Sequence, residues 1–382
     1  MILPKDELEK RIADSYEVPN NVLKAVPKPM VSVRTSTYQH APYIKQCIES
    51  VLMQKTNFPF ELIIGEDFST DGTREIIFEY ARKYPDVIRV VTADYNVGIK
   101  ANGFRCIRRM RGKYIALCEG DDYWTDPHKL QKQVEFLEKH PGYSFCFHQV
   151  KVIYQDDPDK SFTFPDVDDT KWYTTEELLK TNFVPTNSVV YRIRKKDDFP
   201  IDIAPGDWYL HLYNAKFGKF KFMKQQMSVY RKHKSGIWWD YDANRDKIWV
   251  KYGLAHLRMQ HEALRLYSND TDKVAIVHDN IDRLLETFMA VDQQHGTDLL
   301  GQALHMFPEY GKRLLLKKNT CIQERDEKIS EMWQVINGQK DIIAAKEKEL
   351  KAIQASPVWK VATAHQRVKR RAQNSKKRGQ NN

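Results

Sequence analysis

Few cysteines and no long apolar segment occur in this sequence of 382 residues. The five cysteines are odd in number and include no C-x-x-C pair, which disfavours both a disulfide framework and a cysteine zinc site. No run of 18 apolar residues is present, and the first thirty residues contain no apolar core of a secretory signal. We therefore expect neither a membrane-spanning helix nor a signal peptide, and we expect a reduced protein in the cytoplasm.

Acidic residues are absent from the end of the chain. Eight basic residues lie between Lys360 and the last residue, so the formal net charge of +10 leaves +2 for the first 359 residues. The basic segment 356–382 contains Trp359 and has three interpretations: contact with an anionic membrane, a solvated terminus, and nucleic-acid binding. Peripheral membrane contact is favoured, and nucleic acid is disfavoured as a partner because the body is nearly neutral.

Apolar and aromatic residues make up 41% and 12% of the chain, enough to fill a sizeable core. Four apolar strand-like stretches alternate with stretches whose apolar residues recur at helical spacing. The strand-like stretches are 30–38, 60–66, 87–93 and 113–118. Such alternation predicts parallel strands covered by helices on both faces, and the less regular residues 150–235 predict that the complete sheet is mixed. The predicted fold class is α/β, a Rossmann-like mixed sheet followed by an α-helical C-terminal region.

Composition divides the chain into five segments. They are a polar N-terminal lead-in at 1–28, an α/β domain at 29–236, a helical region at 237–316, a long helix or weak coiled coil at 317–355 and the basic tail at 356–382.

The fourth of these segments has a seven-residue repeat. Apolar residues recur every seven positions from Ile322 to Leu350, which suits a coiled-coil seam and a homodimer. Several companion seam positions are polar, and Gly338 is expected to interrupt the helix. A solvated single helix is therefore an equal alternative.

Three carboxylates occur in EGDDYW at 119–124, directly after an apolar strand. Glu119, Asp121 and Asp122 would repel one another unless a cation or hydrogen-bond donors lie among them. Mg²⁺ and Mn²⁺ prefer such oxygen ligands and complete their shells with substrate phosphates. The motif therefore predicts a divalent-cation site, and a solvated acidic turn that caps the next helix is the alternative.

A second acidic loop, EDFSTDGT at 66–73, also follows an apolar strand. Ser69, Asp71 and Thr73 are explained by turn and N-cap chemistry for the following helix. Asp67 is assigned instead to a nucleotide pocket, where a carboxylate accepts hydrogen bonds from a base or a ribose. Neither a Walker A motif nor G-x-G-x-x-G occurs in the chain, so a metal ion must neutralise any bound diphosphate.

Taken in order, these segments resemble family 2 glycosyltransferases of the GT-A fold, which transfer sugars from nucleotide donors with inversion. The resemblance covers about Pro29 to Gly236 and rests on VSVRTSTYQHAPYIKQCIESVLMQ, GEDFSTDGT, NVG and EGDDYW. It implies a divalent cation, Mn²⁺ or Mg²⁺, a nucleotide-sugar donor and a catalytic domain at 29–236. The implied nucleoside-pocket residues are Thr37, Tyr38, Asp67 and Asn96, with Glu119 at the ribose, Asp121 on the metal, and Lys100 and Asp122 as further donor-binding residues.

The chain departs from the family pattern at four positions. Ser36 stands where proline is usual, and Lys100 lies where an arginine is often found. Glu66 and Glu119 stand where aspartate is usual, which leaves the ribose and metal distances open without changing the type of chemistry.

Two later motifs extend the resemblance. Asp207 in APGDWYL is placed where the family has its general base, the carboxylate that takes the proton of the acceptor hydroxyl. The alternative is an N-cap aspartate. His233 in SVYRKHKSG matches a YRxH element that closes over the diphosphate, which implies a metal or phosphate contact. The alternative is a structural or exposed histidine.

The predicted function is transfer of a sugar from a UDP- or dTDP-linked donor to a hydroxyl of a bacterial surface glycan or a lipid-linked acceptor. Two other classes stay open: a sugar-phosphate nucleotidyltransferase, and an inactive glycan-binding or scaffold protein of the same fold. The first would carry a glycine-rich basic loop after the first strand, which TSTYQHAPY is not, and the acidic residues 67, 121 and 207 argue against the second. The expected location is the cytoplasm, with peripheral contact at the inner face of the membrane.

Overall fold

The computed structural model of the chain describes residues 4–20, 28–166, 173–193, 200, 203–236, 245–357, 359 and 363. The chain divides into two compact units, Met1–Met306 and Phe307–Asn382. Apart from its first two residues, Trp359 and Thr363, the predicted basic tail lies outside the described residues.

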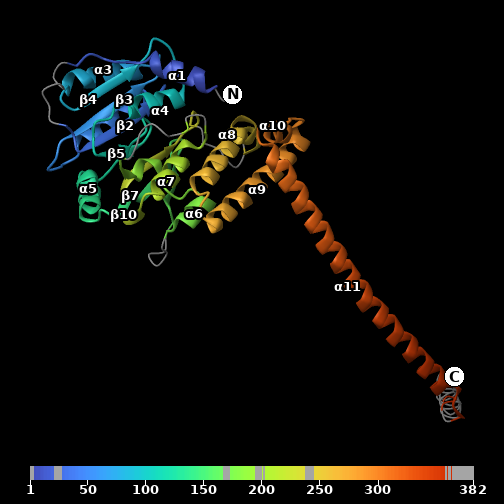
Figure 1. Cartoon of the computed structure of the whole chain (residues 1–382). Coiled ribbons are helices and arrows are strands. Elements are labelled where there is room, and N and C mark those ends of the chain that lie inside the picture. The colour runs from blue at the N-terminus through green and yellow to red at the C-terminus, as the bar shows by residue number, and fades with distance from the viewer. Residues whose placement is uncertain are drawn as a thin grey trace, which may run out of the picture. The chain divides into compact units, whose positions relative to one another are not determined.

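Four parallel strands form one half of the sheet in the first unit, in the spatial order β4-β3-β2-β5 (Figure 1). They are β2 (Val31–Thr37), β3 (Phe60–Glu66), β4 (Ile88–Thr92) and β5 (Tyr114–Leu117). The helices between them are α2 (Ile44–Leu52), α3 (Thr73–Lys83) and α4 (Ile99–Ile107). All four strands coincide with the predicted apolar stretches, so the predicted alternation is confirmed.

Helices cover both faces of this half, as successive residues of β3 demonstrate. Leu62 and Ile64 belong to a core cluster with residues of α2 and α3, whereas Ile63 packs in a second cluster with Cys106 of α4. Side chains alternate between the two faces of a strand, so a continuous apolar run is what a strand buried on both sides requires. The prediction of helices on both faces is confirmed.

The other half of the sheet mixes strand directions. β9 (Val190–Arg192) runs antiparallel to both β5 and β7, while β7 and β10 run parallel to each other. The remaining elements here are β6 (Tyr123–Trp124), β7 (Tyr143–Tyr154), β8 (Asp157–Phe164) and β10 (Lys219–Lys232). A mixed sheet was predicted and is confirmed.

The residues predicted as a lead-in join the folded unit. α1 (Lys5–Ala13) buries Leu8 and Ile12 in a cluster with Ala93 and Ala101, and β1 (Tyr16–Glu17) pairs antiparallel with β4. The segment was predicted only as a polar lead-in, because a helix that buries a single stripe of side chains is polar in composition.

From Arg245 onward the described elements are all helices, as predicted (Figure 1). They are α8 (Arg245–Leu266), α9 (Thr271–His295), α10 (Leu299–Met306) and α11 (Pro308–Ala355). Three further helices lie among the strands of the mixed half of the sheet: α5 (Lys129–Lys139), α6 (Thr175–Lys180) and α7 (Gly206–Ala215). α11 continues through Gly338, so the expected interruption was wrong. A single glycine costs an α-helix only about 1 kcal/mol relative to alanine, which does not break it. Among the described helices, none is long and apolar enough to cross a membrane.

Close packing of β3 against α4 predicts the effect of adding one methyl group. A Cβ at Gly65 would overlap the Asn102 amide oxygen and lie 2.7 Å from Cys106 Sγ. Asn102 cannot move freely because its Nδ2 donates to the Gly65 carbonyl at 2.8 Å. We expect Gly65→Ala to lower the free energy of unfolding by about 1–3 kcal/mol in urea denaturation.

Gly142→Ala is the matched control. A Cβ at Gly142 meets nothing within 4 Å, so its cost should stay within about 0.5 kcal/mol. Equal stability of the two variants would contradict the packing argument.

Candidate active site

Loops from four parallel strands meet at the carboxyl edge of the sheet. Asp67 N donates to the Thr37 carbonyl at 3.2 Å, and Gly120 N donates to the Ser36 carbonyl at 3.0 Å. Asp67 in turn accepts a hydrogen bond from Val97 N at 2.8 Å. The loops after β2, β3, β4 and β5 therefore form one continuous surface, the position at which ligands bind in parallel α/β sheets.

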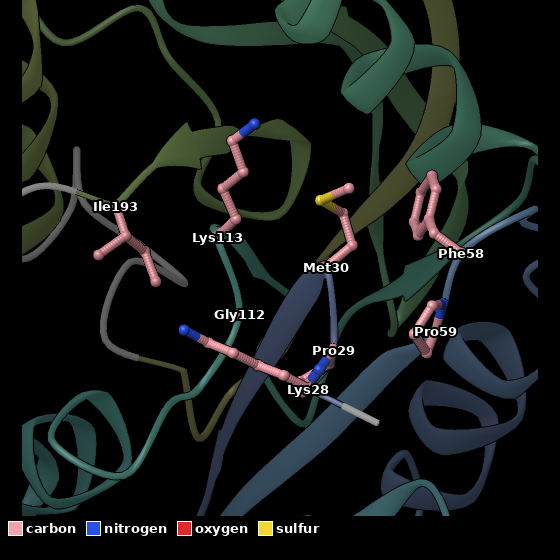
Figure 2. Close-up of a pocket in the computed structure, with 8 residues that line it drawn as sticks. All are labelled: Lys28, Pro29, Met30, Phe58, Pro59, Gly112, Lys113 and Ile193. Atoms are coloured by element: carbon pink, nitrogen blue, oxygen red, sulfur yellow. The ribbon is translucent and has the colours of Figure 1, made fainter. Parts of the chain in front are cut away.

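A shallow hollow lies at the opposite edge of the same strands. It is lined by residues 28–30, 58–59 and 112–113, which precede β2, β3 and β5, and by Ile193 (Figure 2). None of the sequence-predicted site residues lines it. We therefore place the candidate site at the acidic carboxyl edge.

Glu119 is held by two partners from β2. Arg34 forms an ion pair with its carboxylate, and Ser36 N donates to Glu119 Oε2 at 3.2 Å. Burial raises the pKa of Glu119, and the Arg34 guanidinium offsets this only in part. The extra methylene of glutamate, compared with the aspartate usual here, is used in reaching β2.

Asp121 faces two histidines. Its Oδ2 lies 3.0 Å from His233 Nε2 and 4.0 Å from His40 Nε2. Burial alone would raise the pKa of Asp121, but the hydrogen bond with His233 and the two imidazoles lower it below its usual value. The structure thus brings together Asp121 and His233, the two predicted metal ligands, from positions 112 residues apart.

Asp122 is buried and points to β10. Its Oδ1 accepts a hydrogen bond from Arg231 N at 2.8 Å. Burial, followed by the charge of Asp121, raises the pKa of Asp122 well above its usual value. The adjacent carboxylates therefore differ in their surroundings, which lower the pKa of Asp121 and raise that of Asp122.

Arg231, near the end of β10 and two residues before His233, contacts the acidic turn. Its Nε donates to the Asp121 carbonyl at 2.9 Å, and its NH2 group donates to Gln46 at 2.6 Å. The guanidinium also lies 4.9 Å from the ring centroid of Tyr43. Arg231 was not among the predicted site residues, although its position two residues before His233, within the same motif, was a usable signal.

The predicted nucleoside residues lie around the ends of β2 and β3. Asp67 is buried, and its carboxylate accepts from Val97 N and Gly98 N at 2.8 and 3.0 Å. Asn96 donates to the Asp67 carbonyl at 3.1 Å. The hydroxyl of Thr37 is buried without a hydrogen-bond partner in the described chain, whereas Tyr38 is 47% exposed. These positions suit a pocket rim, and their roles stay predictions.

The residues explained as turn chemistry tie two loops together. Asp71 accepts from Ala41 N at 3.0 Å and from Thr73 N at 3.1 Å, and Ser69 Oγ accepts from Gln39 N at 3.1 Å. The helix begins at Thr73 with Gly72 as its N-cap. Lys100 lies in the first turn of α4, directly after the loop that follows β4.

Asp207 is the second residue of α7, and Pro205 is the N-cap, so Asp207 does not occupy the N-cap position. Its Oδ1 nevertheless accepts from Trp208 N at 2.8 Å, and its Oδ2 accepts from Thr186 Oγ1 at 2.9 Å. These contacts orient the carboxylate without enclosing it, since Asp207 remains partly exposed.

Asn187 connects the segment that holds Asp207 to the acidic turn. Thr186 Oγ1 donates to Asp207 Oδ2, and the carbonyl of the next residue, Asn187, accepts from Trp124 Nε1 of EGDDYW at 3.0 Å. Asn187 Nδ2 also donates to the Val229 carbonyl of β10 at 2.9 Å. The predicted base and the predicted metal ligands therefore lie on segments that contact one another.

His40 is a residue that sequence reasoning missed. Its Nδ1 is buried without a hydrogen-bond partner in the described chain, and burial lowers the pKa of its imidazole. One ligand atom each from His40, Asp121 and His233 lie within 4.8 Å of one another. The only signal was its place in the loop directly after β2.

A family model described as glycosyl transferase family 2 matches residues 32–200. An uncharacterized protein of Mycobacterium tuberculosis is 41% identical over 248 residues, which cover 65% of this chain and 71% of that protein. The chain belongs to glycosyltransferase family 2. As a member of this family it is a glycosyltransferase, and the predicted class of enzyme is confirmed.

Other similar proteins carry more specific names. The putative teichuronic acid biosynthesis glycosyltransferase TuaG of Bacillus subtilis is 40% identical over 119 residues, which cover 31% of this glycosyltransferase and 46% of TuaG. Among solved structures, a Pyrobaculum calidifontis mannosyltransferase with GDP-Man and Mn²⁺ has a TM-score of 0.49 at 18% identity, covering 81% and 89% of the two chains. Staphylococcus aureus TarS with UDP has a TM-score of 0.46 at 16% identity, covering 70% and 74%.

Family membership and the mixed sheet together confirm the predicted fold class of this glycosyltransferase, a GT-A type α/β sheet followed by helices. The sheet alone would also have suited a nucleotidyltransferase, and the family match argues against that alternative.

Proposed function

We propose that this glycosyltransferase moves a sugar, with inversion and the help of a divalent cation, from a UDP- or dTDP-linked donor to a hydroxyl of a glycan or lipid-linked acceptor. One observation carries the proposal: Asp121 and His233 meet at 3.0 Å, beside the segment that holds Asp207. Thr186, which donates to Asp207, precedes Asn187, whose carbonyl accepts from Trp124 of the acidic motif. A metal position beside a separate, partly exposed carboxylate is the arrangement that inverting transfer needs.

The residues present fit a divalent cation. Asp121 offers a carboxylate oxygen, which ligates Mn²⁺ or Mg²⁺, and His233 offers an imidazole nitrogen, which suits a transition metal. Nearby, the buried hydroxyls of Ser36 and Thr37 have no hydrogen-bond partner in the described chain, which suits a polar ligand. Held there, the cation would neutralise charge on the diphosphate leaving group.

Asp207 would act as the general base. Its carboxylate would accept the proton of the acceptor hydroxyl while the hydroxyl oxygen bonds to the anomeric carbon and the bond to the diphosphate breaks on the opposite face. Thr186 and the backbone of Trp208 already orient the carboxylate by hydrogen bonds of 2.9 and 2.8 Å. A base fixed in this way needs little reorganisation to meet the acceptor.

Donor binding is assigned to the loops after β2, β3, β4 and β5. We propose Thr37, Tyr38, Asp67 and Asn96 for the nucleoside and Glu119 for the ribose, with Lys100 and Asp122 supporting the donor. Asp122 would act through the hydrogen bond that fixes Arg231, since it is buried.

The acceptor is proposed to be a bacterial cell-surface glycan or its lipid-linked precursor. The name of TuaG, which refers to teichuronic acid biosynthesis, supports this choice. Exposed Ile329, Ile336, Ile343 and Leu350 along α11 support a homodimer through this helix. The basic tail is proposed to hold the enzyme at the inner face of the membrane.

A thermal-shift screen with Mn²⁺ tests the proposal. A ligand that binds only the native state stabilises it by about 2.7 kcal/mol at 100 times its Kd. We expect UDP or dTDP to raise the melting temperature only when Mn²⁺ is present, and Asp121→Asn to weaken this nucleotide affinity at least about tenfold.

The matched control is Asp86→Asn, which changes an exposed aspartate before β4. It should bind nucleotide like the unaltered protein. If Asp121→Asn folds and binds nucleotide with undiminished Mn²⁺ dependence, Asp121 is not a metal ligand.

Asp207→Asn should keep donor binding and lose transfer by about two to four orders of magnitude, the usual range for a positioned base. The measurements are single-turnover transfer and nucleotide affinity. Asp272→Asn, in the first turn of α9, is the control for a helix-end effect. Near-native turnover in Asp207→Asn would assign the base to another residue, and a large drop in melting temperature would support the helix-capping alternative.

Truncation after Ala355 should preserve transfer to a soluble acceptor and weaken sedimentation with anionic vesicles. It removes Trp359 and all eight basic residues of the tail, each worth about 1 kcal/mol near an anionic surface. Vesicle binding by the full chain should fade at 1 M salt, where the Debye length is about 3 Å. If the full-length protein does not bind such vesicles at low salt but binds RNA, the membrane proposal fails and the tail is interpreted as a nucleic-acid-binding segment.

A further inference from the structure

His40 stands beside the proposed metal position although no motif points to it. It belongs to the loop between β2 and α2, 81 residues before Asp121. Its Nε2 lies 4.0 Å from Asp121 Oδ2, and its ring centroid lies 5.9 Å from that of His233. Two imidazoles and one carboxylate therefore converge from three separate segments of the chain.

The backbone around His40 is fixed from both sides. His40 N donates to Thr73 Oγ1 at 2.8 Å, and its carbonyl accepts from Tyr43 N and Ile44 N at 2.9 and 2.8 Å. The preceding Gln39 has a φ of 56°, a left-handed conformation that a non-glycine residue adopts only when its surroundings impose it. The chain is thus turned and anchored so that the His40 ring faces Asp121.

Gly120 permits the close approach of the acidic turn to this ring. A Cβ at Gly120 would lie 2.8 Å from His40 Nδ1 and 2.6 Å from Thr37 Oγ1. A side chain at this position would therefore push the turn away from the loop after β2. The missing Cβ lets Asp121 come within reach of the imidazole.

Hydrogen bonding does not account for the position of the ring. In the described chain His40 Nδ1 is buried without a hydrogen-bond partner. The distance of 4.0 Å from His40 Nε2 to Asp121 Oδ2 is too long for a hydrogen bond. Two atoms bound at about 2.0–2.2 Å from one ion lie roughly 3 to 4 Å apart. The separations of 3.0 and 4.0 Å from Asp121 Oδ2 to the two imidazoles span that range.

We propose that His40 is a third protein ligand of the metal, and that the site therefore selects Mn²⁺ or a similar transition metal over Mg²⁺. The proposal rests on the proposed metal-assisted transfer and specifies its metal site. Imidazole nitrogens suit transition metals, whereas Mg²⁺ prefers a shell of oxygen ligands and waters. Three protein ligands also leave positions open for diphosphate oxygens, as catalytic metal sites require.

The test measures binding of the metal alone to the full-length protein without nucleotide. Calorimetry should give tighter binding of Mn²⁺ than of Mg²⁺. His40→Gln should weaken Mn²⁺ binding at least about tenfold, because even losing an outer-shell partner costs about 10- to 100-fold. Its effect on Mg²⁺ should be smaller. His128→Gln is the matched control, since His128 is an exposed histidine 3.9 Å from Asp126.

Electron spin-echo spectroscopy of bound Mn²⁺ supplies a second readout. Nitrogen modulation from two imidazoles is expected in the unaltered protein, and from one imidazole in His40→Gln. Modulation from only one imidazole in the unaltered protein would overturn the proposal, even if the variant fails to fold. Unchanged Mn²⁺ affinity in a folded His40→Gln would also overturn it.

The two proposals fail separately. Unaltered Mn²⁺ binding in His40→Gln, together with Mn²⁺-dependent nucleotide binding and sugar transfer, would remove His40 and leave the proposed function standing. Mn²⁺ bound through two imidazoles in a protein that neither binds nucleotide nor transfers a sugar would support the His40 ligand and contradict the proposed function.

Discussion

Concentrated negative charge after β5 is the constraint on which the rest of the site depends. Glu119, Asp121 and Asp122 lie within four residues and are largely removed from water. Each carboxylate therefore needs a hydrogen-bond donor or a positive charge beside it. Arg34 on β2 supplies it for Glu119, and the end of β10 supplies it for both aspartates, through His233 for Asp121 and the Arg231 backbone for Asp122. The acidic turn thereby fastens both halves of the mixed sheet together at the edge where the donor is proposed to bind.

The two adjacent aspartates of the turn have different electrostatic surroundings. The imidazoles lower the pKa of Asp121, whereas burial raises the pKa of Asp122 well above its usual value. Two neighbouring aspartates would otherwise compete for one proton in a poorly solvated place. Asp121 is the carboxylate proposed to bind the cation, while Asp122 accepts the hydrogen bond from Arg231 N near the end of β10.

Family membership and local geometry answer different questions about this enzyme. The family match establishes a glycosyltransferase, and it is silent on why this chain tolerates glutamate at position 119 or a histidine at position 40. The structure supplies those reasons: Glu119 reaches back to Arg34, and Gly120 leaves room for the His40 ring beside Asp121. In this chain the departure at Glu119 is thus matched by its ion pair with Arg34.

The four parallel strands, the helices on both faces and the acidic loops could be predicted from the sequence, because strand and helix periodicity and strand-end motifs are local properties. Asp121 and His233 were also named in advance, since each lies in a recognisable motif. The helix and strand before β2 escaped prediction because a short element with one buried stripe has a polar composition. The partnership of His40, Asp121 and His233 arose only in the tertiary structure. Parallel strands deliver their loops to one edge, but hydrogen bonds between distant segments decide which side chains face one another there.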